Sequence, residues 1–220
     1  MKVQIEKTIH PLSEVSYDEI KVLFNAVYSH SFAVALWAEK DLQLLSELFP
    51  KGQVAVKLNG QLAGCILSLI LSSDFISSSY NYKKVVADYT FTTHTNEGDI
   101  LYGIEVCVNP KFRKMGLGKM LYNYRKKLCR ELNLKKIMFA GRIPNYHKYS
   151  AALTAQQYVE KVIGKEIKDP VLNFQLANGY TLKGVIPEYL EDRQSGNHAV
   201  LMEWLNPAYK ERETGSSGFL

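Results

Sequence analysis

Hydrophobic positions along the chain follow two different periods. Alternation at every second residue is typical of a half-buried strand, and spacing of three or four residues is typical of one face of a helix. Ile20, Leu23 and Phe24 fall on one helical stripe, for example. The strands predicted in this way are residues 1–9, 52–58, 61–71, 99–108, 134–141, 180–186 and 198–205. The predicted helices are residues 16–32, 38–50, 116–132, 154–166 and 170–177, with one further short helix near 82–89.

Turn and capping residues mark the ends of several of these elements. Asn59-Gly60 lies between two predicted strands and is a strong hairpin signal. Ser16 and Thr154 stand where helix N-caps are expected. The order of the elements then predicts a mixed sheet covered by helices, which places the chain in the α+β class.

The composition is that of one globular domain. Hydrophobic residues make up 46% of the 220 residues and charged residues 22%, enough for a substantial core. We expect one domain in residues 1–208 and a loose tail in 209–220. No stretch approaches the roughly 20 apolar residues that span a bilayer, and the amino-terminal segment lacks the apolar core of a secretory signal. Three cysteines without a CxxC pair indicate reduced thiols in a cytoplasmic protein, and no metal site is predicted.

Positive charge is concentrated in one part of the sequence. Ten of the 27 Lys and Arg residues, but only one of the 22 acids, lie between Lys111 and Lys136. Gly116 and Gly118 lie within this segment, between a predicted strand and a predicted helix. Glycines allow a ligand to approach the backbone, and a helix N-terminus favours anions. We therefore expect an anion site, although the basic residues further along the helix also fit a solvated face. A nucleic-acid surface is not expected, because no broad basic surface or known motif is visible.

Two common phosphate-binding motifs do not fit this turn. A dinucleotide fingerprint needs a third glycine where the chain has Leu121, and a P-loop needs a first glycine where the chain has Arg113. What remains is Arg113-Lys114-Met115-Gly116-Leu117-Gly118, an R-x-x-G-x-G pattern that follows a strand and begins a helix. A tight turn that binds no ligand is the alternative interpretation of this short pattern.

The R-x-x-G-x-G turn, preceded by Val108-Asn109-Pro110, resembles the acetyl-CoA signature of the GNAT superfamily of N-acetyltransferases. The hairpin before it, the strand after it and the late segment 172–180 follow in the order of that family, so the resemblance covers nearly the whole chain. It implies a mostly antiparallel mixed sheet of about seven strands flanked by helices, with a helical insertion after the fifth strand. The late segments at 141–149 and 169–190 also resemble the acetyltransferase domain fused to nitrilase-type carbon–nitrogen hydrolases.

The resemblance implies a set of residues for acetyl-CoA. The backbone after the strand would hold the pyrophosphate, and the end of the strand would pair with pantetheine and polarise the thioester carbonyl. The residues expected to bind the cofactor are Val106, Cys107, Val108, Arg113, Lys114, Met115, Gly116, Leu117, Gly118, Lys119 and Asn145.

Glu105 is the candidate catalytic base. An amine with an ordinary pKa of about 10.4 arrives protonated and must lose a proton before it attacks. Glu105 is the one acid between Asp99 and Asn109, on a mostly apolar strand where a carboxylate is costly unless it has a partner or a task. A structural ion pair is the alternative interpretation.

The general acid is less well defined by the sequence. Gln175 stands where family members often have a tyrosine, and an amide is a poor proton donor. Tyr146, His147 and Tyr149 follow the fifth strand, and we name Tyr146 and Tyr149 as candidates. Each of these tyrosines also fits a packing role. Cys107 without a histidine partner is better read as filling the strand than as a nucleophile.

Two functions from different classes follow. The first is an acetyl-CoA-dependent N-acyltransferase that moves an acetyl group to a primary amine, in a small molecule or a peptide, by direct attack in a ternary complex. The alternative is a non-catalytic CoA-binding module that regulates or docks a nitrilase-type hydrolase. A homodimer is left open. We expect the segment 142–169 to shape the acceptor site, because loops near active sites often carry specificity.

Overall fold

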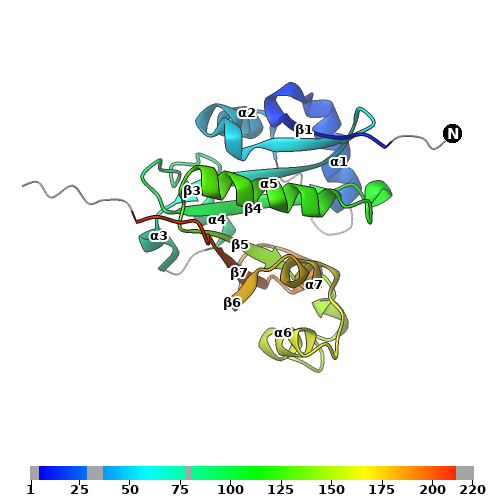
Figure 1. Cartoon of the computed structure of the whole chain (residues 1–220). Helices are drawn as coiled ribbons and strands as arrows, with labels where there is room; N and C mark the ends of the chain where they lie inside the picture. Colours follow the sequence, from blue (N-terminus) through cyan, green and yellow to red (C-terminus); the bar gives the residue numbers. More distant parts are fainter. Residues whose placement is uncertain (1–4, 29–36, 78–80, 212–220) are drawn as a thin grey trace, which may run out of the picture.

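A computed structural model describes residues 5–28, 37–77 and 81–211, and these form one seven-stranded sheet with helices on both faces (Figure 1). The strand order is β1-β2-β3-β4-β5-β7-β6, and only β4 and β5 pair in parallel. The mixed, mostly antiparallel sheet predicted from the sequence is therefore confirmed. The strands are β1 (Lys7–Pro11), β2 (Val54–Leu58), β3 (Gln61–Leu71), β4 (Ile100–Val108), β5 (Lys136–Arg142), β6 (Thr181–Ile186) and β7 (Ala199–Leu205).

The helices follow the predicted stripes with a few differences. They are α1 (Tyr17–Tyr28), α2 (Glu39–Leu48), α3 (Ser73–Ser77), α4 (Tyr82–Val85), α5 (Leu117–Glu131), α6 (Ala155–Ile163) and α7 (Pro170–Ala177). Short 3-10 turns are η1 (Leu12–Glu14), η2 (Pro50–Gly52), η3 (Pro110–Phe112), η4 (Tyr146–Lys148) and η5 (Arg193–Ser195). Thr154 caps α6 by accepting from the Gln157 backbone N–H at 3.2 Å, and Ser16 accepts from the Glu19 N–H at 3.4 Å.

Two predicted elements differ clearly from the structure. The first strand begins at Lys7 rather than at the chain start, and Ile5, predicted to lie in it, is 52% exposed. Alternation alone predicted it, but only residues from Lys7 onward pair with β2, from Lys7 opposite Leu58. In its described residues, 73–77 and 81–99, the segment 73–99 holds two short helices where one was predicted, because residues 73–77 also form a helical turn. Residues 1–4, and the predicted end of the first helix at 29–32, lie outside the described residues.

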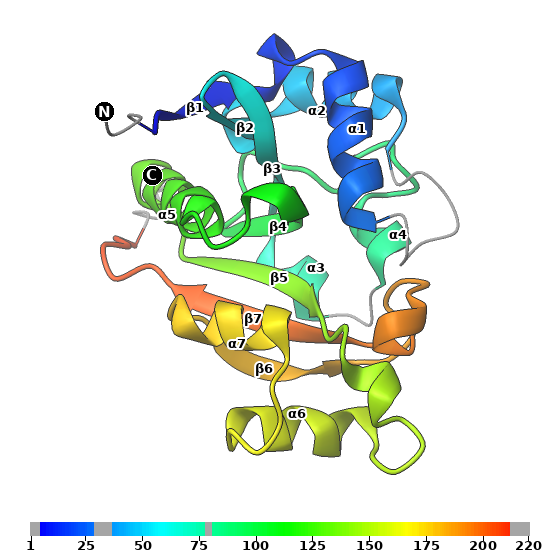
Figure 2. The same cartoon turned by 90° about the vertical axis from the view of Figure 1, so that its right-hand side faces the viewer.

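The helices divide the core between the two faces of the sheet. Helices α1 and α2 pack on one face, where Leu23 and Leu45 are fully buried among β3 and β4 side chains. Helix α5 crosses the opposite face, and α7 and α6 follow beyond it (Figure 2). Within the described residues, no helix combines the length and apolarity that crossing a bilayer requires.

The parallel strands β4 and β5 separate before they end. Their pairing stops at Gly103 opposite Phe139, although β4 continues to Val108 and β5 to Arg142. Ile104 is an extra residue in the ladder with β3, a bulge that bends β4 at the same point. We call the opening between residues 104–108 and 140–142 the fork, and the candidate site is built around it.

Candidate functional site

The glycine turn has the geometry of an anion site. Gly116 has φ of 80° and Lys114 has φ of 63°, left-handed conformations that let the chain reverse into α5. The Met120 N–H donates to the Gly116 carbonyl, so the N–H groups of residues 117–119 precede the hydrogen-bond ladder of the helix. The predicted turn therefore presents backbone donors and the positive end of a 15-residue helix.

A lysine from β1 joins this turn. Lys7 donates from Nζ to the Met115 carbonyl at 2.6 Å, 108 residues away in sequence. Phe174 of α7 lies against the other glycine, because a Cβ on Gly118 would meet its ring at 3.0 Å. Neither residue was predicted from the sequence, and no local pattern could have placed them here.

The carboxyl end of β4 has a strand partner on one side. Val106 and Val108 pair with Ile66 and Gly64 of β3, whereas β5 has separated from this part of β4. The edge of residues 106–108 that faces the fork is therefore the place where an extended ligand can add to the sheet.

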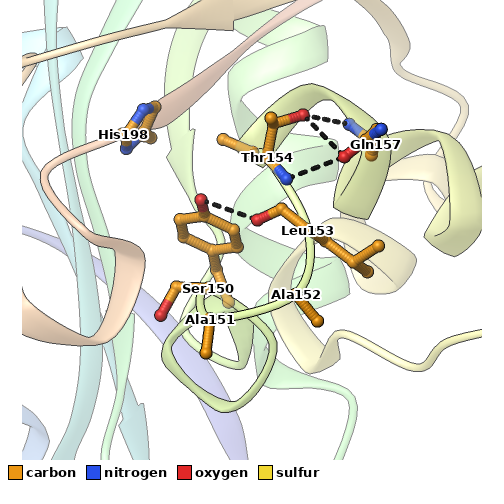
Figure 3. A pocket seen from close by; sticks show the side chains of 9 residues that line it. Ser150, Ala151, Ala152, Leu153, Thr154, Gln157 and His198 are labelled. Atoms are coloured by element: carbon orange, nitrogen blue, oxygen red, sulfur yellow. Dashed lines mark hydrogen bonds between the residues drawn. The ribbon is translucent and has the colours of Figure 1, made fainter.

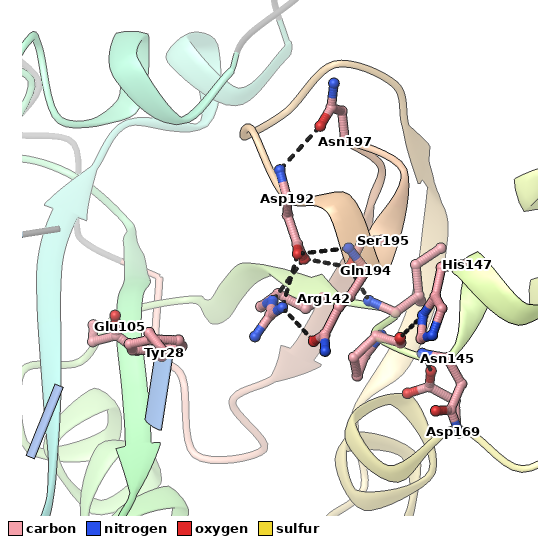
Figure 4. A network of polar contacts seen from close by, with 12 residues as sticks. Tyr28, Glu105, Arg142, Asn145, His147, Asp169, Asp192, Gln194, Ser195 and Asn197 are labelled. Atoms are coloured by element: carbon pink, nitrogen blue, oxygen red, sulfur yellow. Dashed lines mark hydrogen bonds and ion pairs between the residues drawn. The ribbon is translucent and has the colours of Figure 1, made fainter. Parts of the chain in front are cut away.

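Glu105 lies at the fork on the α1 face, with a partly buried side chain. Its Oε1 accepts from the Tyr28 hydroxyl at 2.5 Å and from the Val106 N–H at 2.8 Å (Figure 4). Burial raises the pKa of Glu105, while the Tyr28 hydroxyl, the Val106 N–H, the Trp37 indole and the Arg142 charge oppose the rise. A carboxylate with a raised pKa is better suited to take a proton than one fixed in an ion pair.

Arg142, at the end of β5, lies on the same face. Its guanidinium donates in bidentate fashion to Asp192, with Nε to Oδ2 at 2.7 Å and Nη2 to Oδ1 at 2.8 Å. It also lies over the Tyr28 ring, 5.8 Å from the centroid. Residues from α1, β4, β5 and the segment before β7 are thus brought together at the fork.

A second arginine lies at the fork on the α5 face. Arg125 is 1% exposed and donates from Nη2 to the carbonyls of Leu67 at 3.1 Å and Glu105 at 2.8 Å. Gly103 leaves room for it, because a Cβ there would meet its Nη1 at 2.6 Å. The sequence did contain a signal, since Arg125 falls four residues after Leu121 on the apolar stripe.

Gln175 lies on the same face as Arg125. It is 2% exposed and packs against Gly141, where a Cβ would collide with its carboxamide. Its Oε1 is buried without a hydrogen-bond partner in the described part of the chain. It interacts with Tyr122, whose pKa is raised to about 12 by burial and lowered in part by this contact. Neither group is suited to give up a proton at neutral pH.

The candidates after β5 form a separate group. The Tyr146 hydroxyl already donates to the Leu153 carbonyl at 3.1 Å, and the Tyr149 ring packs on Tyr158. Asn145 donates to the Lys168 carbonyl at 2.9 Å. In Figure 4 the Arg142–Asp192 pair lies between Glu105 and Asn145. The roles proposed for Tyr146, Tyr149 and Asn145 remain predictions.

A hollow of about 460 Å³ opens beside Tyr146 in the insertion after β5 (Figure 3). The small residues 150–152 form one wall, and His198 lies across from them. Glu105 is not among its lining residues, so the hollow is separate from the fork.

Cys107 lies beside Cys65, with the two sulfur atoms 3.6 Å apart in the core. Burial raises the pKa of the Cys107 thiol well above its usual value, so a thiolate nucleophile is disfavoured. Among the described residues, no group of three or more His, Cys, Asp or Glu side chains could hold a metal ion.

The acetyltransferase (GNAT) family model matches residues 18–156, which is more than half of the chain and includes the glycine turn and Glu105. The chain belongs to this family. The predicted GNAT fold and the predicted enzyme class, N-acetyltransferase, are those of the family.

Two proteins of Bacillus subtilis (strain 168) are similar in sequence to this GNAT chain. The "Uncharacterized N-acetyltransferase YkwB" is 36% identical over 176 residues, which are 80% of this chain and 78% of that protein. The "Probable hydrolase YhcX" is 44% identical over 179 residues, 81% of this chain but 35% of that protein. The chain therefore spans about a third of the length of YhcX.

The fold also matches solved structures. The GphF GNAT-like decarboxylase, in complex with isobutyryl-CoA, superposes with a TM-score of 0.74 at 19% identity, covering 91% of this chain and 99% of that one. This likeness shows the fold over a larger share of the chain than the family match covers.

Proposed function

We propose that this GNAT domain is an acetyl-CoA-dependent N-acyltransferase that moves an acetyl group to a primary amine by direct attack in a ternary complex. The observation that carries the proposal is Glu105, a carboxylate with a raised pKa where β4 leaves β5. A protonated amine that reaches the fork can transfer a proton to Glu105 and then attack the thioester. The nitrogen–carbon bond forms, and the carbon–sulfur bond breaks with its electron pair leaving on the sulfur. The nitrogen gives up its second proton to water or to the released thiolate.

The residues of the glycine turn fit the pyrophosphate of acetyl-CoA. The N–H groups of residues 117–119 and the charges of Arg113, Lys114 and Lys119 lie at the N-terminus of α5. The backbone of Val106–Val108 would pair with the pantetheine arm along the edge of β4 that no longer pairs with β5. An N–H of this segment would polarise the thioester carbonyl.

The leaving sulfur needs little help from an acid. A thiol has an ordinary pKa near ~8.5, so the thiolate is a fair leaving group. Gln175 stands where family members often have a tyrosine, and we therefore propose departure as thiolate, with Tyr146 and Tyr149 as the residues to test for a proton donor. The insertion at 142–169, with its hollow beside Tyr146, would bind the distal part of the acceptor.

A hydrolase partner is part of the proposal. YhcX is called a probable hydrolase, and this chain corresponds to only a third of it. We propose that residues 1–208 form an acetyltransferase domain of the kind that works with a nitrilase-type hydrolase. The alternative, a CoA-binding module without turnover, shares the glycine turn but does not need the Glu105 carboxylate.

The test is thiol release from acetyl-CoA over a panel of small amines and amino-terminal peptides, with Glu105→Gln as the variant. Since a general base contributes typically ~10²–10⁴-fold, Glu105→Gln should lower the acetylation rate by about two decades at neutral pH and leave CoA affinity unchanged. The deficit should shrink at alkaline pH, where more acceptor arrives deprotonated. Glu203→Gln is the matched control, a carboxylate on β7 paired with Lys136 and Lys183. CoA binding without thiol release from any amine would favour the module.

A further inference from the structure

One oxygen of the Glu105 carboxylate accepts two hydrogen bonds. Both the Tyr28 hydroxyl and the Val106 N–H donate to Oε1, so the two hydrogen bonds fall on one oxygen. Among the described side chains, Tyr28 donates the hydrogen bond to this carboxylate, and the Trp37 indole lies near it without forming a hydrogen bond. The orientation of Tyr28 therefore bears directly on that of Glu105.

Arg142 lies against Tyr28 from β5. Its guanidinium is 5.8 Å from the ring centroid, within the range of a cation–π contact. Arg142 comes from the strand that has left β4, and Tyr28 is at the end of α1, so the contact joins the two sides of the fork.

Asp192 prevents the guanidinium from turning. Besides the two bonds from Arg142, its carboxylate accepts from the Ser195 hydroxyl at 2.5 Å and from the Gln194 N–H at 3.1 Å. Asp192 is 2% exposed, and both of its carboxylate oxygens accept hydrogen bonds, which hold the side chain in one orientation (Figure 4). A planar guanidinium held by two parallel bonds has one orientation, which a lysine could not reproduce.

We propose that Arg142, held by Asp192, is a positioning residue for the acetyl transfer: it holds the Tyr28 hydroxyl on one oxygen of Glu105 and leaves the other oxygen to take the proton of the acceptor. The proposal rests on the proposed function, in which Glu105 is the base. It makes Asp192, which does not touch Glu105, part of the same device.

The charges around Glu105 decide how removal of Arg142 would be observed. Tyr28 of α1, Tyr82 of α4, Cys107 of β4 and Trp37 surround it, and the Arg125 guanidinium interacts with it from the other face. Arg142 adds a positive charge that lowers the pKa of Glu105. Its loss should raise that pKa, and the acidic limb of the rate profile should move to higher pH because the base must be ionised.

The experiment measures kcat/KM against pH for one good amine, and CoA affinity by calorimetry, in Arg142→Met, Arg142→Lys and Asp192→Asn. Arg142→Met should shift the acidic limb upward and lower kcat about tenfold, a part of the ~10²–10⁴-fold that a general base contributes, because the base remains but loses its orientation. Asp192→Asn should lower kcat with a smaller shift, because the charge remains while its orientation is lost. Arg142→Lys should recover the position of the limb but not the full kcat. CoA affinity should not change.

Lys136→Met is the matched control, because Lys136 begins the strand that Arg142 ends and pairs with the buried Glu203 at 3.0 Å. It should lower stability without moving the limb. A folded Arg142→Met or Asp192→Asn enzyme with the wild-type profile and kcat would overturn the proposal, as would an equal shift in Lys136→Met. If the wild type releases no thiol with any amine, the proposed function fails. The effect of Arg142 on Glu105 can still be tested in that case, because the pKa of Glu105, followed by carboxyl NMR, must be higher in Arg142→Met than in the wild type.

Discussion

Each face of the sheet carries an arginine at the fork, and the two arginines have different surroundings. On the α5 face, Arg125 is buried against backbone carbonyls of β3 and β4 and has no carboxylate in hydrogen-bond contact among the described residues. On the α1 face, Arg142 is paired with Asp192 and lies beside the Tyr28–Glu105 hydrogen bond. One arginine fixes the backbone shape of the fork, and the other lies next to the carboxylate. Changes on the first face should therefore lower stability, and changes on the second should alter the reaction.

The largest loss of stability should come from Arg125→Met. The substitution leaves the Leu67 and Glu105 carbonyls and the Ser68 hydroxyl without the Arg125 donor in a buried site. Because each unsatisfied buried group costs ~1–3 kcal/mol, the free energy of unfolding should fall by about 3 kcal/mol or more. Urea unfolding followed by circular dichroism measures it, with exposed Arg130→Met on the same helix as the control. A loss no larger than in Arg130→Met would contradict the structural role of Arg125.

Gly103 and Gly141, the glycines where β4 and β5 separate, should also differ in how much stability their substitution costs. Gly103→Ala would push its methyl group against Arg125, which three hydrogen bonds hold in place, whereas Gly141→Ala would push against Gln175, whose Oε1 is unpartnered. Since overpacking costs typically ~1–3 kcal/mol, we expect Gly103→Ala near the upper end and Gly141→Ala near the lower end. Gly184→Ala on β6, where a Cβ has nothing within 4 Å, is the control. Thermal melts of the three variants give the order, and a greater loss for Gly141→Ala would reverse it.

The smallest change in stability should come from Glu105→Gln, and its sign is the most informative. Burial raises the pKa of Glu105 in the folded state, so folding favours its protonated form. The free energy of unfolding therefore falls as pH rises from the unfolded pKa of Glu105 to its folded pKa. The cost is complete above the folded pKa and absent below the unfolded pKa. The neutral amide, which can still accept from Tyr28 and Val106, should raise the melting temperature at neutral pH, and the gain should vanish in acid.

Scanning calorimetry of Glu105→Gln and wild type between pH 4 and 8, a range that brackets the ordinary Glu pKa of about 4.3, checks this sign. A variant that melts below the wild type at neutral pH would assign Glu105 to a structural ion pair and not to catalysis. Higher stability combined with a lower rate is the pattern expected of a functional carboxylate held in a costly place.

The sequence by itself determined the parts of the protein that are local. The apolar stripe of residues 117–132, the Asn59-Gly60 hairpin and the R-x-x-G-x-G turn are short-range patterns, and each corresponds to an observed element. Glu105 could be chosen because it is an isolated acid on an apolar strand. The order of the elements, read with the family resemblance, was enough for the fold.

Only the tertiary structure decided what surrounds Glu105. Tyr28 lies 77 residues away in sequence and Asp192 lies 50 residues from Arg142, and no periodicity encodes such separations. The end of β4–β5 pairing is likewise a property of the sheet, set by the bulge at Ile104 and by Arg125 behind it. Side-chain pairing across the fork depends on which strands separate and how far. Local sequence patterns do not predict where the strands separate, because the separation results from packing on both faces of the sheet at once.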